Sequence, residues 1–179
     1  IYQQIPLAVC VPRAREEVAE IVRVARRHRA PVLGRGGGTS LAGQTTGRAV
    51  VVDFTKYLNR LLEVNEKERW ARVEPGLARD TLNAAVAPRG LMFAPETSTS
   101  NRAVIGGMMA NNSSGMMSIR YGRTSEHVLE VKRFWPMGKR SISVRNRVRP
   151  GRSASGGCAR RCSASPRKIA NSSSRAGRA

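Results

Sequence analysis

The chain has 179 residues, enough for one domain, with 40% hydrophobic residues and a formal net charge of +20. Its two Trp, three Tyr and three Phe are too few for a nucleic-acid surface built on stacked rings, and no run approaches the roughly 18 apolar residues of a membrane-spanning helix. Residues 1–132 hold 19 basic and all 12 acidic residues, whereas residues 133–179 hold 13 basic residues and no acidic one. Two different compositions are therefore joined in one chain.

The start of the chain and its cysteines bear on its origin. The sequence begins with Ile1 rather than Met and lacks the layout of a signal peptide, so we expect a fragment of a soluble, cytoplasmic protein without an integral membrane segment. Cys10 lies in an apolar stretch, and Cys158 and Cys162 have no His or further Cys at zinc-finger spacing. We therefore predict no metal site.

The first 54 residues predict strands, one helix and a long loop. A short apolar run between two prolines predicts a strand at 6–12. Residues 15–29 have the apolar spacing of an amphipathic helix, with glutamates in the first turn and arginines in the last. Strands at 31–33 and 49–54 flank a loop at 34–47, in which six of 14 residues are glycine.

Beyond this point the same alternation continues. We predict a strand at 70–74, a helix at 77–87 that ends near Gly90, and strands at 91–94 and 127–132. Interleaved strands and helices give an α+β or α/β body with two polar, glycine-rich loops.

The first glycine-rich loop has the composition of an anion cradle. In the segment RGGGTS at 35–40, glycines let successive backbone N–H groups turn toward one point, and Thr39 and Ser40 add hydroxyl donors. A flexible surface turn is the alternative. The Walker pattern is excluded because the only Gly-Lys pair, at 138–139, has Arg133 where that pattern requires glycine.

The second loop favours a long nucleotide cofactor. Glycines at 106–107 are followed by the polar run Asn-Asn-Ser-Ser-Gly at 111–115, whose amides and hydroxyls can bond a heteroaromatic ring or a ribityl chain. Clusters of Asn and Ser are also ordinary turn chemistry, and that alternative stays open.

Three ordered segments carry a resemblance to a known family. RGGGTSLAGQ at 35–44, PETSTSNRAVIGGMMANNSSG at 95–115 and IRYGRTSEHVLEVK at 119–132 resemble the FAD-binding half of the vanillyl-alcohol oxidase type flavoproteins, in the branch of D-lactate and D-2-hydroxyglutarate dehydrogenases. The resemblance implies an α+β, two-subdomain FAD-binding PCMH-type fold, present in part over residues 1–132. It also implies a flavin-dependent oxidoreductase that acts on a small 2-hydroxy acid by hydride transfer to the flavin.

The resemblance assigns cofactor-binding roles in which the first loop wraps the FAD pyrophosphate and the second lines the flavin side. These residues are Arg35, Gly36, Gly37, Gly38, Thr39, Ser40, Leu41, Pro95, Glu96, Ser100, Ile105, Gly106, Gly107, Asn111, Asn112 and Gly115. Members with a histidyl-linked flavin have His where this chain has Thr39, so non-covalent FAD is implied. Because the backbone at Gly37 is expected to meet the pyrophosphate, Gly37→Val should abolish FAD retention and leave the fold largely intact.

The resemblance also limits what this chain contains. Related sequences often have a Cys and a His near the flavin, in the segment where residues 112–118 have neither. The catalytic base and the carboxylate clamp are expected in a substrate domain outside this chain, so we predict no catalytic residue here. The electron acceptor is not indicated. Two other functions are considered: another enzyme of the same FAD fold, such as a sugar-nucleotide reductase, and a basic RNA-binding module.

The last 47 residues differ from the rest of the sequence. Residues 133–179 contain 11 Arg and nine Ser without a sustained apolar period, so we predict a disordered tail. It is interpreted either as an RNA-binding arm or as out-of-frame translation. Back-translating residues 134–139 in a shifted frame permits V-L-A-D-G-E, similar to the family's next strand. A frame slip after Lys132 is our preferred hypothesis, with no nucleic-acid partner, and the coding DNA around that codon tests it.

Overall fold

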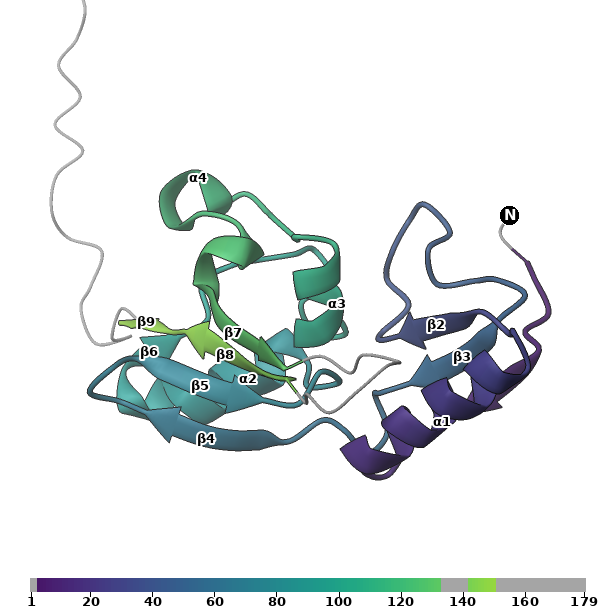
Figure 1. The fold of residues 1–179 in the computed structure, drawn as a ribbon. Helices are drawn as coiled ribbons and strands as arrows, with labels where there is room; N and C mark the ends of the chain where they lie inside the picture. The colour runs from purple at the N-terminus through teal and green to yellow at the C-terminus, as the bar shows by residue number, and fades with distance from the viewer. Residues whose placement is uncertain (1–2, 133–141, 151–179) are drawn as a thin grey trace, which may run out of the picture.

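The computed structural model describes residues 3–132 and 142–150, which form two β-sheet bodies side by side (Figure 1). The first body is a parallel sheet of three strands in the order β1-β3-β2. Its strands are β1 (Ala8–Cys10), β2 (Val32–Arg35) and β3 (Val50–Asp53). The helix α1 (Arg15–Arg27) lies along this sheet and connects β1 to β2, which run in the same direction on either side of β3 and therefore need a crossover connection.

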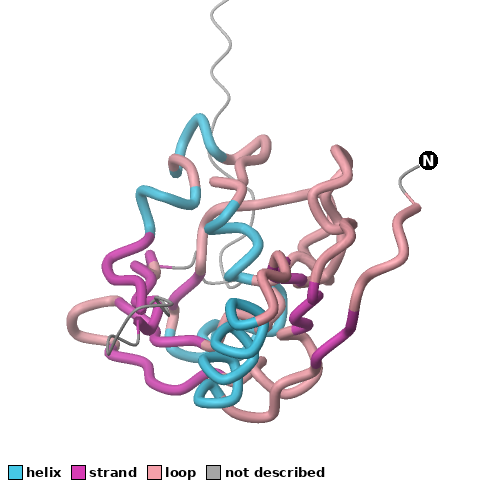
Figure 2. The backbone as a smooth tube through the Cα atoms, turned by 45° about the vertical axis from the view of Figure 1, so that its right-hand side comes forward, coloured by secondary structure: helices cyan, strands magenta, loops and turns pink. Residues whose placement is uncertain are grey.

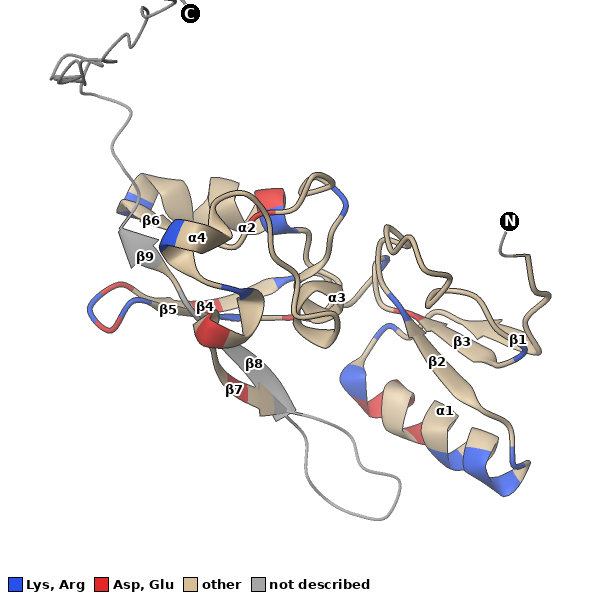
Figure 3. Cartoon of the chain, turned by 90° about the horizontal axis from the view of Figure 1, so that it is seen from above, with Lys and Arg blue, Asp and Glu red and all other residues tan. Residues whose placement is uncertain are grey.

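Helix α1 follows the charge pattern of its sequence. Glu16 and Glu17 lie in its first turn and basic residues in its last, so both ends complement the helix dipole (Figure 3). The Glu17 carboxylate also accepts a hydrogen bond from the backbone N–H of Arg13, at 2.8 Å. Val18 and Ala25 are the buried residues of the helix. These features confirm the predicted amphipathic helix.

The second body is built on an antiparallel sheet in the order β4-β5-β8-β7, with a separate two-stranded pair, β6-β9 (Figure 1). Figure 2 shows in pink the loops that connect the helices and strands. The larger sheet contains β4 (Leu61–Asn65), β5 (Trp70–Val73), β7 (Val128–Lys132) and β8 (Ile142–Arg147). The small pair is β6 (Leu91–Met92) with β9 (Arg149–Pro150). The helical elements are α2 (Arg79–Val86), η1 (Ala87–Arg89), α3 (Ile105–Ala110), α4 (Ser118–Tyr121) and η2 (Thr124–His127).

The main hydrophobic core lies in the second body. Strand β5, helices α2 and α3, and the segments between them all contribute buried side chains. The cluster comprises Ala71, Val73, Leu77, Leu82, Val86, Leu91, Phe93, Ala103, Ile105, Met108 and Val148. Gly90, after η1, has the left-handed φ of 67° that lets the chain turn from the helix into β6, as its place in the sequence predicts.

A compact junction connects the two bodies. The backbone N–H of Gly76 donates to the carbonyl of Leu58 at 2.8 Å, and a Cβ at Gly76 would lie 2.0 Å from the carbonyl oxygen of Phe54. The Glu74 carboxylate accepts hydrogen bonds from the Arg60 backbone N–H at 2.8 Å and from its guanidinium at 3.0 Å. Through its hydrogen bond to the guanidinium and its opposite charge, Glu74 raises the pKa of Arg60.

The structure corrects the sequence prediction in three places. Strand β4 was not predicted, and residues 105–110 and 118–121, expected in loops, form the short helices α3 and α4. Residues 142–150, expected to be disordered, form β8 and β9, and Val148 is fully buried. The average composition of the 47-residue tail did not reveal this nine-residue segment, and one partner of β8, the strand β5, is distant in sequence. The remaining tail residues, 133–141 and 151–179, lie outside the described residues. Within the described part of the chain, no helix is long and apolar enough to cross a membrane.

The central position of β8 predicts where the chain can be shortened. Truncation after Lys132 removes the strand that pairs with both β5 and β7, together with the buried Val148. We expect this variant to lose cooperative thermal unfolding, measured by circular dichroism, because two strands lose their ladder partner. Truncation after Pro150 keeps every described strand pair and should retain the transition. Cooperative unfolding of both variants at one temperature would contradict the assignment of β8.

Candidate functional site

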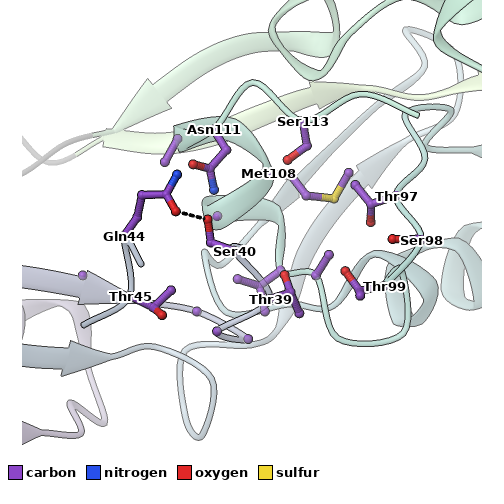
Figure 4. Close-up of a pocket in the computed structure, with 18 residues that line it drawn as sticks. Thr39, Ser40, Gln44, Thr45, Thr97, Ser98, Thr99, Met108, Asn111 and Ser113 are labelled. Carbon is purple, nitrogen blue, oxygen red and sulfur yellow. Dashed lines mark hydrogen bonds between the residues drawn. The ribbon is translucent and has the colours of Figure 1, made fainter. Parts of the chain in front are cut away.

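A cavity of about 500 Å³ lies between the glycine-rich loop of the first body and residues 97–113 of the second (Figure 4). The first side supplies Gly34, Gly36, Gly37, Gly38, Thr39, Ser40, Gln44 and Thr45. The second side supplies Thr97, Ser98, Thr99, Ala103, Val104, Gly107, Met108, Ala110, Asn111 and Ser113. The two glycine-rich loops that the sequence singles out therefore meet around one pocket.

Two glycines bring the sides of the pocket together. A Cβ at Gly36 would lie 2.3 Å from Val104 Cγ2, and one at Gly37 would lie 2.1 Å from the carbonyl oxygen of Arg102. Both separations are far below van der Waals contact, so only glycine permits this approach. The expectation that Gly37→Val leaves the fold largely intact is therefore wrong, because its side chain would collide with the backbone of the other body.

Gly38 and Arg35 shape the loop between β2 and β3. Gly38 has a φ of 67°, and the Arg35 guanidinium lies 2.7 Å from the position that its Cβ would occupy. Arg35 also donates a hydrogen bond to the carbonyl oxygen of Thr45, at 3.3 Å. The guanidinium thus contacts the start and the end of the loop and holds them together.

Polar but uncharged side chains form the walls of the pocket. Among the described lining residues there is no Lys, Arg, Asp or Glu. Hydroxyl and amide groups project from both sides, and the Ser40 hydroxyl is hydrogen-bonded to Gln44 (Figure 4). Ala103, Val104 and Met108 are buried and form an apolar part of the lining. The pocket suits a ligand with both an apolar ring and many hydrogen-bonding groups.

Thr97 carries the clearest sign that a ligand completes the pocket. Its Oγ1 is buried and has no hydrogen-bond partner; among the described side chains this is true of only one other atom, Arg72 Nε. Buried polar atoms in folded proteins are almost always hydrogen-bonded. Because Thr97 lines the cavity, a polar group placed there would satisfy its hydroxyl.

The far end of the second wall is fixed by Thr124. This fully buried residue donates from its backbone N–H, at 3.1 Å, and from its hydroxyl, at 2.7 Å, to the carbonyl oxygen of Ser113. The backbone N–H of Ser113 in turn donates to Met108, at 2.8 Å, at the end of α3. The lining residues 108–113 are therefore held from both directions.

Seven of the sixteen residues predicted to bind the cofactor line this pocket. They are Gly36, Gly37, Gly38, Thr39, Ser40, Gly107 and Asn111. The first five form a continuous segment, so the backbone pattern of the loop located them. Gly107 and Asn111 lie on α3 and at its end, facing the same cavity.

The other nine predicted residues lie outside the lining, and several have evident structural partners. Arg35 braces its own loop and Leu41 is 93% exposed. Ile105 is in the core, and the Ser100 hydroxyl donates to Asp80 at 2.9 Å. The rest pack or bond within the second body. The carbonyl oxygen of Pro95 accepts a hydrogen bond from Arg79, and the Asn112 side chain accepts one from the Ser125 N–H. Gly106 packs closely against Pro75, and Gly115 packs against the carbonyl group of Glu96.

The sequence interpretation passed over other lining residues. Thr97, Ser98 and Thr99 lie inside the quoted PETSTS motif, whereas Gln44 and Thr45 end the first loop. Their shared signal is a local density of hydroxyl and amide side chains beside glycines. That signal marks a loop but does not show which face of the loop meets the cavity.

Comparisons with known proteins agree with this geometry. The FAD binding domain family matches residues 6–141, and the chain belongs to this family. The chain is 47% identical over 135 residues to D-2-hydroxyglutarate dehydrogenase of Escherichia coli (strain K12), covering 74% of this chain and 13% of the relative. It is 36% identical over 133 residues to the glycolate oxidase subunit GlcD of Bacillus subtilis (strain 168), covering 73% and 28%.

A solved structure shares the fold. An alkyldihydroxyacetonephosphate synthase superposes with a TM-score of 0.70 at 19% identity, covering 79% of this chain and 34% of the synthase chain. The two-subdomain α+β FAD-binding fold expected from the sequence is thus confirmed, and its cofactor is FAD. The chain spans only about an eighth to a quarter of the curated relatives described above.

Two glycine variants separate packing from ligand binding. A Cβ at Gly107 would meet only Val104 Cγ2, at 3.5 Å, so Gly107→Ala fits the protein and projects a methyl group at the pocket. We expect it to retain or raise the unfolding temperature, because alanine favours the helix by roughly 0.5–1 kcal/mol. We expect its affinity for FAD to fall by about tenfold, since overpacking costs about 1–3 kcal/mol. Calorimetry and flavin fluorescence measure the two effects.

Gly37→Ala is the matched comparison. Its methyl group would collide with the Arg102 carbonyl, so it should lower the unfolding temperature as well as FAD binding. Equal losses of stability in both variants would show that Gly107, like Gly37, is required for packing and that its Cβ position does not face a ligand.

Proposed function

We propose that this chain binds FAD non-covalently in the pocket between its two bodies, as part of a flavin-dependent oxidoreductase that acts on a 2-hydroxy acid. The observation that carries the proposal is the buried, unpartnered hydroxyl of Thr97 in a glycine-rich pocket, inside the family match. The 2-hydroxy acid substrate class is supported by the relatives named D-2-hydroxyglutarate dehydrogenase and glycolate oxidase subunit.

The lining residues fit a dinucleotide. Backbone N–H groups of Gly36 to Gly38 and the hydroxyls of Thr39 and Ser40 would hold its phosphates. On the other wall, the hydroxyls of residues 97–99 and the amide of Asn111 would hydrogen-bond the flavin portion. Met108 would offer an apolar contact to a ring. Arg35 does not line the pocket, and its role would be to support the loop through its hydrogen bond to Thr45 rather than to contact the phosphates.

The chemistry divides between cofactor and protein. When bound, FAD supplies the acceptor for a hydride from the substrate's α-carbon. Residues of this chain bind and orient the cofactor and exclude water from part of it. Because no ionisable side chain lines the described pocket, the proton acceptor and the cation that would hold a substrate carboxylate come from another part of the complete enzyme.

The absence of a His at Thr39 supports a dissociable cofactor. A histidyl link needs an imidazole nitrogen beside the flavin, and the threonine hydroxyl offers only hydrogen bonding. The two histidines of the chain are elsewhere: His127 is fully buried and hydrogen-bonded to the Tyr121 carbonyl oxygen, and His28 caps α1.

The neutral lining predicts how FAD binding responds to salt. We expect the dissociation constant, measured by flavin fluorescence, to change less than about threefold between 50 and 500 mM salt, because hydroxyl and backbone donors release few counterions. Acid precipitation should leave all flavin in the supernatant. Flavin that stays with the precipitate would contradict non-covalent binding. Tight RNA binding that collapses with salt, without FAD binding, would favour the RNA-binding alternative.

The chain alone should show no turnover. Hydride transfer needs a substrate held about 3 to 3.5 Å from the flavin, and the described pocket has no charged group to hold a carboxylate. The purified chain with FAD is assayed with D-lactate, D-2-hydroxyglutarate and an artificial electron acceptor. Turnover above that of free FAD would show that the rest of the enzyme is dispensable.

A further inference from the structure

The wall of the pocket that contains Thr97 to Thr99 has no helix or strand of its own, since residues 93–102 form only turns and irregular backbone. We propose that Asp80 and Arg79, in the first turn of α2, form with Ser100 a clasp that positions this wall for the cofactor. The inference rests on the proposed FAD-binding function and assigns roles to residues that do not line the pocket.

The clasp holds the beginning of the wall through Arg79. Its Nε donates to the carbonyl oxygen of Pro95 at 3.0 Å, two residues before Thr97. The Arg79 side chain is largely covered, with 16% exposed, and its Nη1 forms an ion pair with Asp80 Oδ1 at 3.0 Å. A charge-assisted contact of this kind is stronger and more directional than one between neutral groups.

The same carboxylate holds the end of the wall. Asp80 Oδ2 accepts a hydrogen bond from the Ser100 hydroxyl at 2.9 Å, and the Asp80 N–H donates to the Ser100 carbonyl oxygen at 3.2 Å. The Arg79 N–H donates to the carbonyl oxygen of Ala103 at 2.9 Å. The first turn of α2 thus binds the loop on both sides of residues 97–99.

Bonds within the loop do not replace the clasp. Arg102 and Ala103 donate backbone hydrogen bonds to the carbonyl oxygen of Thr99, at 2.8 and 2.7 Å. These bonds close a turn after the wall but do not attach the wall to the second body. Hydrogen bonding to a ligand requires placement to within about 0.5 Å, so the attachment to α2 determines whether the wall hydroxyls meet the cofactor.

This geometry makes Ser100 a positioning residue instead of a cofactor ligand. Its hydroxyl is engaged by Asp80, and neither residue lines the cavity. The carboxylate links the two attachments because its oxygens bond different partners, Arg79 on one side and Ser100 on the other. Loss of either bond should therefore loosen the wall without touching the pocket lining.

The test compares variants of the full 179-residue chain. Ser100→Ala removes one bond and keeps the charge of Asp80, and Ser100→Thr retains the hydroxyl. Asp80→Asn keeps an oxygen for Ser100 but removes the charge that pairs with Arg79. The control is Glu63→Gln, which breaks the Arg72 ion pair of 2.7 Å on β4, where the carboxylate side chain is 48% exposed against 46% for Asp80.

Three quantities are measured for each variant: the FAD dissociation constant, the unfolding temperature without FAD, and hydrogen exchange of the peptides covering residues 95–103. We expect Ser100→Ala and Asp80→Asn to weaken FAD binding by about tenfold, the typical effect of losing one hydrogen bond to a charged group. Exchange of these peptides should accelerate in both variants even without FAD. Ser100→Thr and Glu63→Gln should match the unmodified chain.

The outcomes separate the inference from the proposed function. Unchanged FAD affinity in Ser100→Ala and Asp80→Asn overturns the clasp while leaving FAD binding intact. Faster exchange throughout the chain with an equal fall in unfolding temperature also overturns it, because the role would then be general stability. Failure of the unmodified chain to bind FAD refutes the proposed function, whatever the exchange of residues 95–103 shows.

Discussion

The pocket exists because two glycines allow one backbone to rest directly against another. At Gly36 and Gly37 the first body approaches residues 102–104 so closely that a single methyl group would collide with Val104 or with the Arg102 carbonyl. This contact brings the two walls of the pocket together, and the close approach of Gly76 to Phe54 and Leu58 connects the two bodies at the junction. The cavity is thus a product of packing between the two bodies, and the glycine motif forms an interface as well as the phosphate cradle proposed for it.

An uncharged pocket places a particular demand on the binding of a charged cofactor. Burying a pyrophosphate away from water is costly unless its oxygens receive hydrogen bonds. Without a lining cation, that compensation must come from several N–H and O–H groups acting together, which explains the density of Gly, Ser and Thr on both walls. Such groups are fixed dipoles, so their arrangement matters more than their number. Residues that hold these groups in place are therefore important for ligand binding.

The sequence predicted elements whose signals are local. The end charges of α1, the glycine at position 90 and the glycine-rich loop all act within a few residues, and the structure confirms each of them. Strand β4 was missed because its run LLEVN does not alternate cleanly, and its partner β5 defines it. The same distinction between local and long-range signals applies to the predicted site residues. The continuous segment 36–40 lines the pocket, whereas the places of Ile105 and Ser100 were decided by the core and by α2.

The strand order of the second sheet has a consequence for how the chain folds during synthesis. Strand β5 pairs with β8 from Val73 opposite Val144 to Trp70 opposite Arg147, so Val144 follows its partner Val73 by 71 positions in the chain. In the first sheet, β2 and β3 pair across only 18 residues. Since distant pairings form slowly, the first body can fold while the second waits for its central strand. During that interval the edge of β5 is open to incorrect pairing, so the second body depends on a strand that is made much later than its partner.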